Sequence, residues 1–232
     1  KDNLQKAIDE AGFKEPSPIQ IDAIPHILLG KDIVGQAHTG TGKTAAFGLP
    51  VLNQLTGKNA EAVVIVPTRE LAMQVSDELF KFGKFLGINT ATVYGGQAYA
   101  RQLKLIETAS VIVATPGRFL DLLKNGHIKI KPKFVILDEA DEMLDMGFLD
   151  DIKEIFTYLP EDRQTLLFSA TMPVAIKNLA KTILKEPEFV TITKSDVTNK
   201  NITQTYYVVD ERERDDALIR LFDYKNPKKS II

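Results

Sequence analysis

Short, uninterrupted apolar runs recur along the chain, with helical patterns between them. The runs that we interpret as strands are residues 33–34, 62–66, 90–94, 111–114, 134–137 and 165–168. Apolar and polar residues do not alternate within the runs, which is typical of strands buried on both faces of a parallel sheet. The segments between them carry helical spacing, for example 69–85 and 176–183. The strict alternation of strands and helices predicts a doubly wound α/β domain, with helices on both faces of a parallel sheet.

Two predicted helices precede this alternation. Apolar residues at helical spacing indicate an amphipathic helix that ends at Gly12, and a turn rich in proline starts a second helix that ends at Gly30.

The composition changes towards the other end of the chain. Residues 191–201 are polar and are interpreted as a linker, and beyond them we expect a strand at 202–209, a helix at 215–222 and the first residues of a strand at 230–232. Such a small number of elements cannot bury a hydrophobic core of its own. We therefore predict one domain over residues 1–200, linker included, and the truncated start of a second domain over residues 201–232.

Composition excludes several classes of protein. Lys and Arg number 29 against 31 Asp and Glu, so any nucleic-acid binding must rest on a few placed groups rather than on a general positive field. The absence of cysteine excludes disulfides and thiolate metal sites, and the three His show no ligand spacing. No apolar run reaches membrane-spanning length, so we expect a cytoplasmic protein without a membrane partner.

Polar, Gly-rich or acidic clusters follow the six apolar runs at their carboxyl ends. Ligands bind at this edge of an open parallel sheet, so the clusters predict a binding site there.

The first cluster is a Gly-rich loop between a predicted strand and a predicted helix. Its sequence is Ala37-His38-Thr39-Gly40-Thr41-Gly42-Lys43-Thr44. It fits the P-loop pattern, with Ala37 in the place of the first Gly, and the flanking strand and helix disfavour the alternative of a purely structural turn. Backbone N–H groups of such a loop hold phosphate oxygens at a helix N-terminus. Lys43 is expected to reach the β- and γ-phosphates of ATP, and the Thr44 hydroxyl to ligate Mg²⁺. The predicted nucleotide-binding residues of the loop are Thr39, Gly40, Thr41, Gly42, Lys43 and Thr44.

An acidic tetrad, Asp138-Glu139-Ala140-Asp141, follows the run at 134–137. An acidic residue at the end of a buried strand near a P-loop is the expected second anchor of Mg²⁺, partly through water, which is the role that we predict for Asp138. Glu139 can orient or deprotonate the attacking water, so we predict that Lys43, Asp138 and Glu139 are catalytic. The alternative is the acidic first turn of a helix, which the helix dipole favours.

With these motifs the chain resembles the DEAD-box RNA helicases from Gly12 to Ile232. Residues 39–44 and 138–141 match the nucleotide motifs of that family. The sequences Pro67-Thr68-Arg69-Glu70-Leu71, Gly95-Gly96 and Thr115-Pro116-Gly117-Arg118 match its RNA-contacting motifs, and Ser169-Ala170-Thr171 matches the motif that couples hydrolysis to strand separation. The resemblance implies a RecA-like P-loop NTPase fold and ATP hydrolysis coupled to local unwinding of RNA duplexes.

The family's Q motif is present as Phe13-Lys14-Glu15-Pro16-Ser17-Pro18-Ile19-Gln20. The resemblance implies that Gln20 recognises adenine and that Phe13 packs by the base. An amide offers both a donor and an acceptor, which suits adenine. Taken alone, Gln20 would be better interpreted as a polar position on an amphipathic helix, and only the surrounding motif overturns that interpretation.

The expected RNA-binding residues are Thr68, Arg69, Gly95, Gly96, Thr115 and Arg118. Thr and Arg side chains donate to phosphate, and Gly-Gly exposes backbone N–H, so we expect binding to single-stranded or duplex RNA without sequence preference. The alternative for Arg118 is a surface charge or a helix-start residue. Ser169 and Thr171 are expected to hydrogen-bond Asp141 and to couple the nucleotide to the RNA.

The resemblance also implies a partner, which is the second RecA-like domain of the same protein with its arginine fingers. Two other functions are consistent with the motifs. One is a P-loop ATPase that acts on DNA, which the Q motif and the tetrad disfavour. The other is an ATP-gated RNA clamp, which uses the same motifs as an unwinding enzyme.

Overall fold

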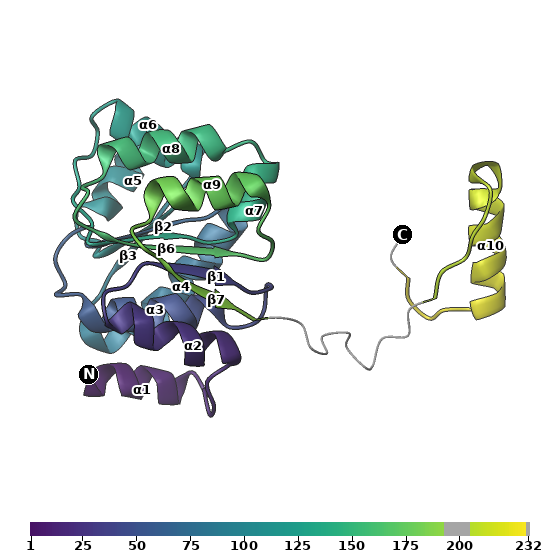
Figure 1. The fold of residues 1–232 in the computed structure, drawn as a ribbon, viewed down its shortest axis with the longest axis horizontal. Helices are drawn as coiled ribbons and strands as arrows, with labels where there is room; N and C mark the ends of the chain where they lie inside the picture. Colours follow the sequence, from purple (N-terminus) through teal and green to yellow (C-terminus); the bar gives the residue numbers. More distant parts are fainter. Residues whose placement is uncertain (193–204, 231–232) are drawn as a thin grey trace. The chain divides into compact units, whose positions relative to one another are not determined.

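Seven parallel strands form one sheet in the order β3-β4-β2-β5-β6-β1-β7 (Figure 1). The strands are β1 (Ile33–Gln36), β2 (Ala62–Ile65), β3 (Thr90–Val93), β4 (Val111–Ala114), β5 (Phe134–Leu137), β6 (Gln164–Ser169) and β7 (Glu188–Thr191). The computed structural model describes residues 1–192 and 205–230, and the chain divides into two units, Lys1–Thr193 and Lys194–Ile232. The sheet and the helices that cover it belong to the first unit.

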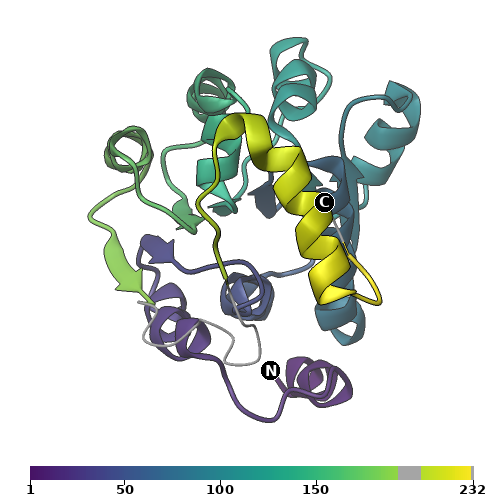
Figure 2. The same cartoon turned by 90° about the vertical axis from the view of Figure 1, so that its right-hand side faces the viewer.

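Helices cover both faces of the sheet, as expected of a doubly wound fold (Figures 1 and 2). One layer consists of α1 (Asp2–Glu10), α2 (Pro18–Leu28), α3 (Lys43–Gln54) and α4 (Arg69–Gly83), followed by a short 3₁₀ turn, η1 (Lys84–Leu86). The other consists of α5 (Tyr99–Ile106), α6 (Pro116–Lys124), α7 (Ala140–Asp145), α8 (Leu149–Tyr158) and α9 (Val174–Ile183). The chain thus builds one layer first and the other afterwards.

The uninterrupted apolar character of the strands follows from this arrangement. In β2, Val63 and Ile65 pack into the core under α5 to α9, whereas Ala62 and Val64 pack into the core under α1 to α4. All four side chains are buried. Because successive side chains of a strand point to opposite faces, a strand between two helical layers needs apolar residues at every position.

Strand β7 was not predicted from the sequence. Among the described residues it pairs only with β1, at the edge of the sheet. Of its four residues only Val190 is buried, while Phe189 is 70% exposed. An edge strand that buries a single side chain has neither the continuous nor the alternating apolar pattern by which strands are found.

The second unit is described over residues 205–230. It contains the 3₁₀ turn η2 (Glu211–Glu213) and the helix α10 (Arg214–Lys225), which confirms the helix expected at 215–222. The strand expected at 202–209 is wrong in its described part, because residues 205–209 form no strand. A strand needs a neighbour for its backbone hydrogen bonds, and the described residues of this unit supply none. Residues 202–204 and 231–232 and the expected linker beyond Ile192 lie outside the described residues.

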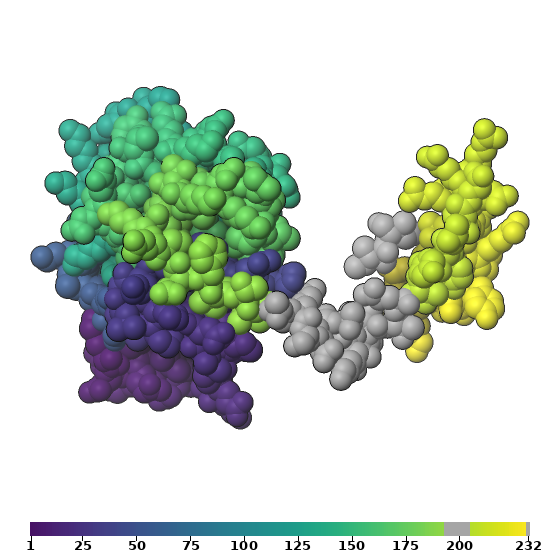
Figure 3. Space-filling model, in the orientation of Figure 1, coloured from purple at the N-terminus to yellow at the C-terminus, as the bar shows by residue number. Residues whose placement is uncertain are grey.

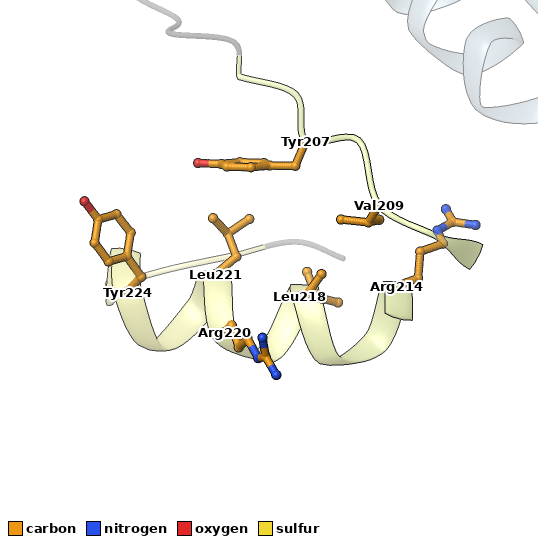
Figure 4. A pocket seen from close by; sticks show the side chains of 8 residues that line it. Tyr207, Val209, Arg214, Leu218, Arg220, Leu221 and Tyr224 are labelled. Carbon is orange, nitrogen blue, oxygen red and sulfur yellow. The ribbon is translucent and has the colours of Figure 1, made fainter. Parts of the chain in front are cut away.

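The side chains of the second unit line an open, mostly apolar hollow of about 490 Å³. Tyr207 and Val209 face Leu218 and Leu221 of α10 across it (Figure 4). None of the residues 205–230 is buried. The unit therefore has an apolar face without the core that would normally cover such a face.

Residues 1–192, in contrast, form a compact body (Figure 3). It contains two hydrophobic cores, one on each side of the sheet. Within the described part of the chain, no helix combines the length and the apolar composition that a bilayer crossing requires.

Candidate nucleotide site and adjoining motif loops

The predicted motifs meet at one edge of the sheet. All strands are parallel, so their carboxyl ends point the same way. The P-loop follows β1, and Asp138 and Ser169 stand at the ends of β5 and β6. Thr68, Gly95 and Thr115 follow β2, β3 and β4. The order of the strands places β5, β6 and β1 side by side, and places β3, β4 and β2 side by side. Nucleotide motifs and RNA motifs therefore occupy adjacent parts of the same edge.

The P-loop turns from β1 into α3 through two glycines in the left-handed region. Gly40 has φ 81° and Gly42, the N-cap of α3, has φ 90°. A Cβ atom on Gly42 would also lie 2.5 Å from Nε2 of Gln20. Conformation and space both restrict this position to glycine, which leaves the backbone N–H groups at the start of α3 open to an anion.

Lys43 lies at the centre of a buried cluster of charges. Its Nζ is 2.9 Å from Oε1 of Glu139 and 3.6 Å from Oδ1 of Asp138. The Thr39 hydroxyl donates to the same Glu139 oxygen at 3.0 Å. Lys43, Asp138 and Glu139 are 5%, 3% and 7% exposed. No acceptor in the described residues is well placed for a hydrogen bond from Nζ, so its contacts with the two carboxylates are charge contacts.

Burial perturbs the acid chemistry of this cluster. Burial is the main cause of a raised pKa of Asp138, about 6 in all, which the Lys43 ammonium acts to lower and the nearby Glu139 carboxylate to raise. A carboxylate that is costly to ionise in this way is stabilised by an additional cation.

The predicted Mg²⁺ ligands fit that requirement. Asp138 offers a buried carboxylate and Thr44 a hydroxyl, and both are the hard oxygen ligands that Mg²⁺ prefers. Magnesium is commonly bound by one or two protein groups together with substrate phosphates. The described residues contain no group of three acidic or His side chains that could hold a metal without such help. Burial raises the pKa of Glu78 on α4, and the Thr44 hydroxyl partly offsets that rise.

Glu139 has an unusual backbone conformation. It adopts φ 55° and ψ 52°, the left-handed region, at the N-cap of α7. Its own N–H donates to Oδ1 of Asp138 at 3.0 Å. A non-glycine residue in this region is strained, and such strain concentrates at functional sites. Nothing in the sequence predicts it.

Gln20 connects the Q motif to the P-loop. Its Nε2 donates to the Gly42 carbonyl at 3.1 Å, and its Oε1 accepts from the Ser17 N–H at 2.9 Å. The side chain is 5% exposed. Phe13 packs on Phe82 of α4, with ring centroids 5.8 Å apart, and remains 38% exposed. The contact between Gln20 and Gly42 joins residues 22 positions apart, and no local pattern predicts it.

Asp141 joins the ends of β5 and β6. Its backbone N–H donates to the Ser169 hydroxyl at 3.1 Å, and its Oδ2 accepts from both the N–H and the hydroxyl of Thr171, each at 2.8 Å. Burial acts to raise the pKa of Asp141, but the hydrogen bonds, with that of Thr171 first among them, outweigh it and lower the pKa. The hydrogen bonds expected for these residues are present, with Ser169 bound to the backbone rather than to the carboxylate.

Three of the expected RNA-binding residues lie around the Gly-Gly turn. Gly96 has φ 89°, and a Cβ on it would lie 3.0 Å from Nη1 of Arg69, so the Arg69 guanidinium lies against this turn. The two threonines among the expected RNA-binding residues each stand at the start of a helix. Thr68 is the N-cap of α4 and accepts from the Leu71 N–H at 3.2 Å, and Thr115 is the buried N-cap of α6.

Arg118, at the start of α6, is held by contacts that the sequence does not predict. Its Nη1 donates to the Gln97 carbonyl at 2.9 Å and to Oε1 of Gln102 at 3.3 Å. Its guanidinium lies 4.4 Å from the ring centroid of Tyr99. The side chain is 12% exposed. Arg118 thus ties the Gly-Gly turn to α6, in addition to any contact with RNA.

Known proteins resemble the chain over its whole length. A family model described as DEAD/DEAH box helicase matches residues 17–179. The DEAD-box ATP-dependent RNA helicase RhpA of Helicobacter pylori is 57% identical over 235 residues, which cover 100% of this chain and 48% of that protein. The DEAD-box ATP-dependent RNA helicase CshA of Streptococcus pneumoniae is 49% identical, over 99% of this chain and 45% of that protein. The chain spans about half the length of the curated relatives it matches.

Solved structures show the same fold. A DEAD box protein from the hyperthermophile Methanococcus jannaschii matches with a TM-score of 0.79 and 42% identity, covering 96% of this chain and 61% of that chain. A hypothetical ATP-dependent RNA helicase from Sulfolobus tokodaii matches with a TM-score of 0.78 and 40% identity, over 83% of this chain and 57% of that chain.

Proposed function

Because the chain belongs to the DEAD/DEAH box helicase family, we propose that it is the ATP-binding half of an ATP-dependent RNA helicase. The observation that carries this proposal is the buried contact of Lys43 with Asp138 and Glu139, directly beside the P-loop and on the same sheet edge as the RNA motifs. Its expected reaction is ATP hydrolysis coupled to local unwinding of RNA duplexes.

On the nucleotide side, Lys43 and the N-terminus of α3 are proposed to bind the phosphates of ATP. Asp138 and Thr44 would hold Mg²⁺, which supplies positive charge to the phosphates when bound. Glu139 is proposed to orient the attacking water and accept its proton. Thr39 and Lys43 share one oxygen of Glu139, so a phosphate that attracts the Lys43 ammonium would leave that carboxylate oxygen freer to act on water.

On the RNA side, the proposed contacts are phosphate and backbone contacts from Thr68, Arg69, Gly96, Thr115 and Arg118, together with the neighbouring Gly95. We expect these groups to contact phosphates and sugars rather than base edges, and therefore binding without sequence preference and with 2′-hydroxyl contacts that favour RNA. Asp141 is proposed to couple the two sites, because its hydrogen bonds to Ser169 and Thr171 fix α7 against the end of β6.

The proposed partner is a second RecA-like domain of the same protein. Residues 201–232 are proposed as its start, and residues 1–200 as the ATP-binding domain with its linker. The apolar hollow of residues 205–230 supports this, since such a face requires further chain to cover it. The relatives RhpA and CshA come from bacteria, where RNA is cytoplasmic, so we propose a cytoplasmic location.

The test is the ATPase rate of the full-length protein with single-stranded RNA, with DNA of the same sequence and without nucleic acid. We expect RNA to stimulate turnover and DNA to fail. Equal stimulation by both would favour a DNA-directed P-loop ATPase. A duplex-release assay would then separate an unwinding enzyme from an RNA clamp, which would hydrolyse ATP without releasing strands.

Gln20→Ala is expected to weaken ATP binding more than GTP binding, by about 3- to 10-fold in the ratio of their dissociation constants, since hydrogen bonds to adenine are lost. The variant also loses the hydrogen bond to the Gly42 carbonyl, and we expect that loss to weaken both nucleotides alike. The ratio therefore isolates recognition of the base.

Titration of fluorescent ATP and GTP analogues into the variant measures this ratio. Lys43→Ala serves as the control. Within the nucleotide, Lys43 is expected to contact only the phosphates, so its loss should weaken both nucleotides equally. An unchanged ratio in Gln20→Ala would show that Gln20 supports the P-loop without reading the base.

A further inference from the structure

Arg118 retains hydrogen-bond donors that its protein contacts do not use. A guanidinium has five N–H donors. In the described part of the chain, those of Nη1 reach Gln97 and Gln102, while Nη2 has no bonded acceptor. Nε lies 3.9 Å from Oδ2 of Asp121, which is beyond hydrogen-bond length. The donors at Nε and Nη2 are therefore available to a phosphate.

Asp121 is the residue best placed to take those donors. It lies three positions after Arg118 on α6, where side chains are neighbours, and Arg and carboxylate groups readily form bidentate pairs. Such a pair would neutralise Arg118 and occupy the N–H groups that a phosphate requires.

Two other donors hold the Asp121 carboxylate. The Tyr99 hydroxyl donates to Oδ2, and Nδ2 of Asn125 donates to Oδ1 at 2.7 Å. These two donors hold the carboxylate in a position where its contact with Arg118 is 3.9 Å long. The hydrogen bond to Asp121 is also the first cause of a raised pKa for Tyr99, so the hydroxyl stays protonated as a donor.

The Tyr99 ring has a second contact with the same arginine. The guanidinium of Arg118 lies 4.4 Å from its centroid, within the range of cation–π attraction. His127 packs on the ring at a centroid distance of 5.3 Å. One tyrosine thus supports Arg118 with its ring and restrains the competing carboxylate with its hydroxyl.

We propose that Tyr99 is a positioning residue for RNA binding, which keeps Asp121 from pairing with Arg118 and so leaves the guanidinium free for an RNA phosphate. This inference rests on the proposed function, in which Arg118 contacts RNA. Tyr99 itself is not expected to touch the phosphate.

The test uses the full-length protein and three variants, Tyr99→Phe, Asp121→Asn and the double variant. Tyr99→Phe keeps the ring but frees the carboxylate, so we expect single-stranded RNA to bind about 3- to 10-fold more weakly in the ATP-bound state, through loss of one charged contact. The slope of log affinity against log salt should fall by about 0.7, the value for one phosphate of a single strand. The loss should be found in the RNA concentration for half-maximal ATPase stimulation rather than in kcat.

The double variant provides the decisive comparison. Asp121→Asn removes the competing charge, so in that background Tyr99→Phe should have no effect on RNA affinity or on the salt slope. Tyr158→Phe, which removes the hydroxyl of an exposed tyrosine on α8, should bind RNA as the unmodified protein does.

Each outcome has a distinct meaning. An equal loss from Tyr99→Phe with and without Asp121→Asn would overturn the proposal, because the hydroxyl would then act through something other than Asp121. Unchanged RNA affinity in Tyr99→Phe would overturn it as well. If the unmodified protein binds no RNA, the proposed function fails and the inference fails with it.

Discussion

Replacement of Glu139 by Gln is expected to reduce ATP turnover of the full-length protein by about 10²–10⁴-fold, the usual contribution of a general base. An amide retains an oxygen for the hydrogen bond from Thr39 but cannot accept a proton from water. It also removes one of the two carboxylates that contact Lys43. ATP should therefore bind at least as tightly as before, since the phosphates no longer compete with Glu139 for the ammonium.

The measurement combines steady-state hydrolysis with equilibrium binding of ATP to the same variant. Glu142→Gln is the matched control, since Glu142 lies exposed on the same helix, α7, and should keep normal turnover. Normal turnover in Glu139→Gln would assign the proton transfer to another group. A loss of ATP binding together with turnover would indicate a damaged site rather than a missing base.

This chain taken alone is expected to bind adenine nucleotides and to hydrolyse them very slowly, even with RNA. Of the cationic groups in the described residues, the Lys43 ammonium is the one that forms ion pairs with Asp138 and Glu139. Arginine fingers contribute about 10³–10⁵ in rate where they complete a phosphoryl-transfer site. If the proposed second domain supplies such fingers, its addition should raise RNA-stimulated turnover by a comparable factor.

The experiment compares the ATPase rate of this chain with RNA, before and after addition of a separately produced second half from the full-length protein. The same mixture with Lys43→Ala in this chain reports any contaminating activity. Fast RNA-stimulated turnover by the chain alone would contradict the prediction, and would place the complete catalytic machinery within these 232 residues.

Most of the sheet could be predicted because burial leaves a local mark on the sequence. Strand β2 is apolar at every position since helices cover both of its faces, and the run at 62–66 identifies it directly. Strand β7 leaves no such mark, because only Val190 is buried in it. Residues 205–209 carry the composition of a strand, yet without a neighbouring strand that composition does not produce one.

The candidate site divides in the same way. Its P-loop and acidic tetrad are short continuous motifs whose chemistry can be read without a structure. The contacts that position them join distant parts of the chain, as Gln20 joins Gly42 and Arg118 joins Gln97. The left-handed backbone of Glu139 is set by its surroundings at the end of β5 rather than by its residue type. These features depend on packing between distant parts of the chain, and no local sequence pattern predicts that packing.

The hydrogen bond from Gln20 to the Gly42 carbonyl has a consequence for altering nucleotide preference by design. If Gln20 reads the base as proposed, a variant built to accept guanine or an enlarged purine analogue would begin at this residue. That same side chain restrains the residue that caps α3, and it caps α2 through the Ser17 N–H. An orthogonal nucleotide pocket therefore has to be built at residues 17, 20 and 42 together. A library that varies residue 20 alone would also disturb the P-loop, through the lost hydrogen bond to the Gly42 carbonyl.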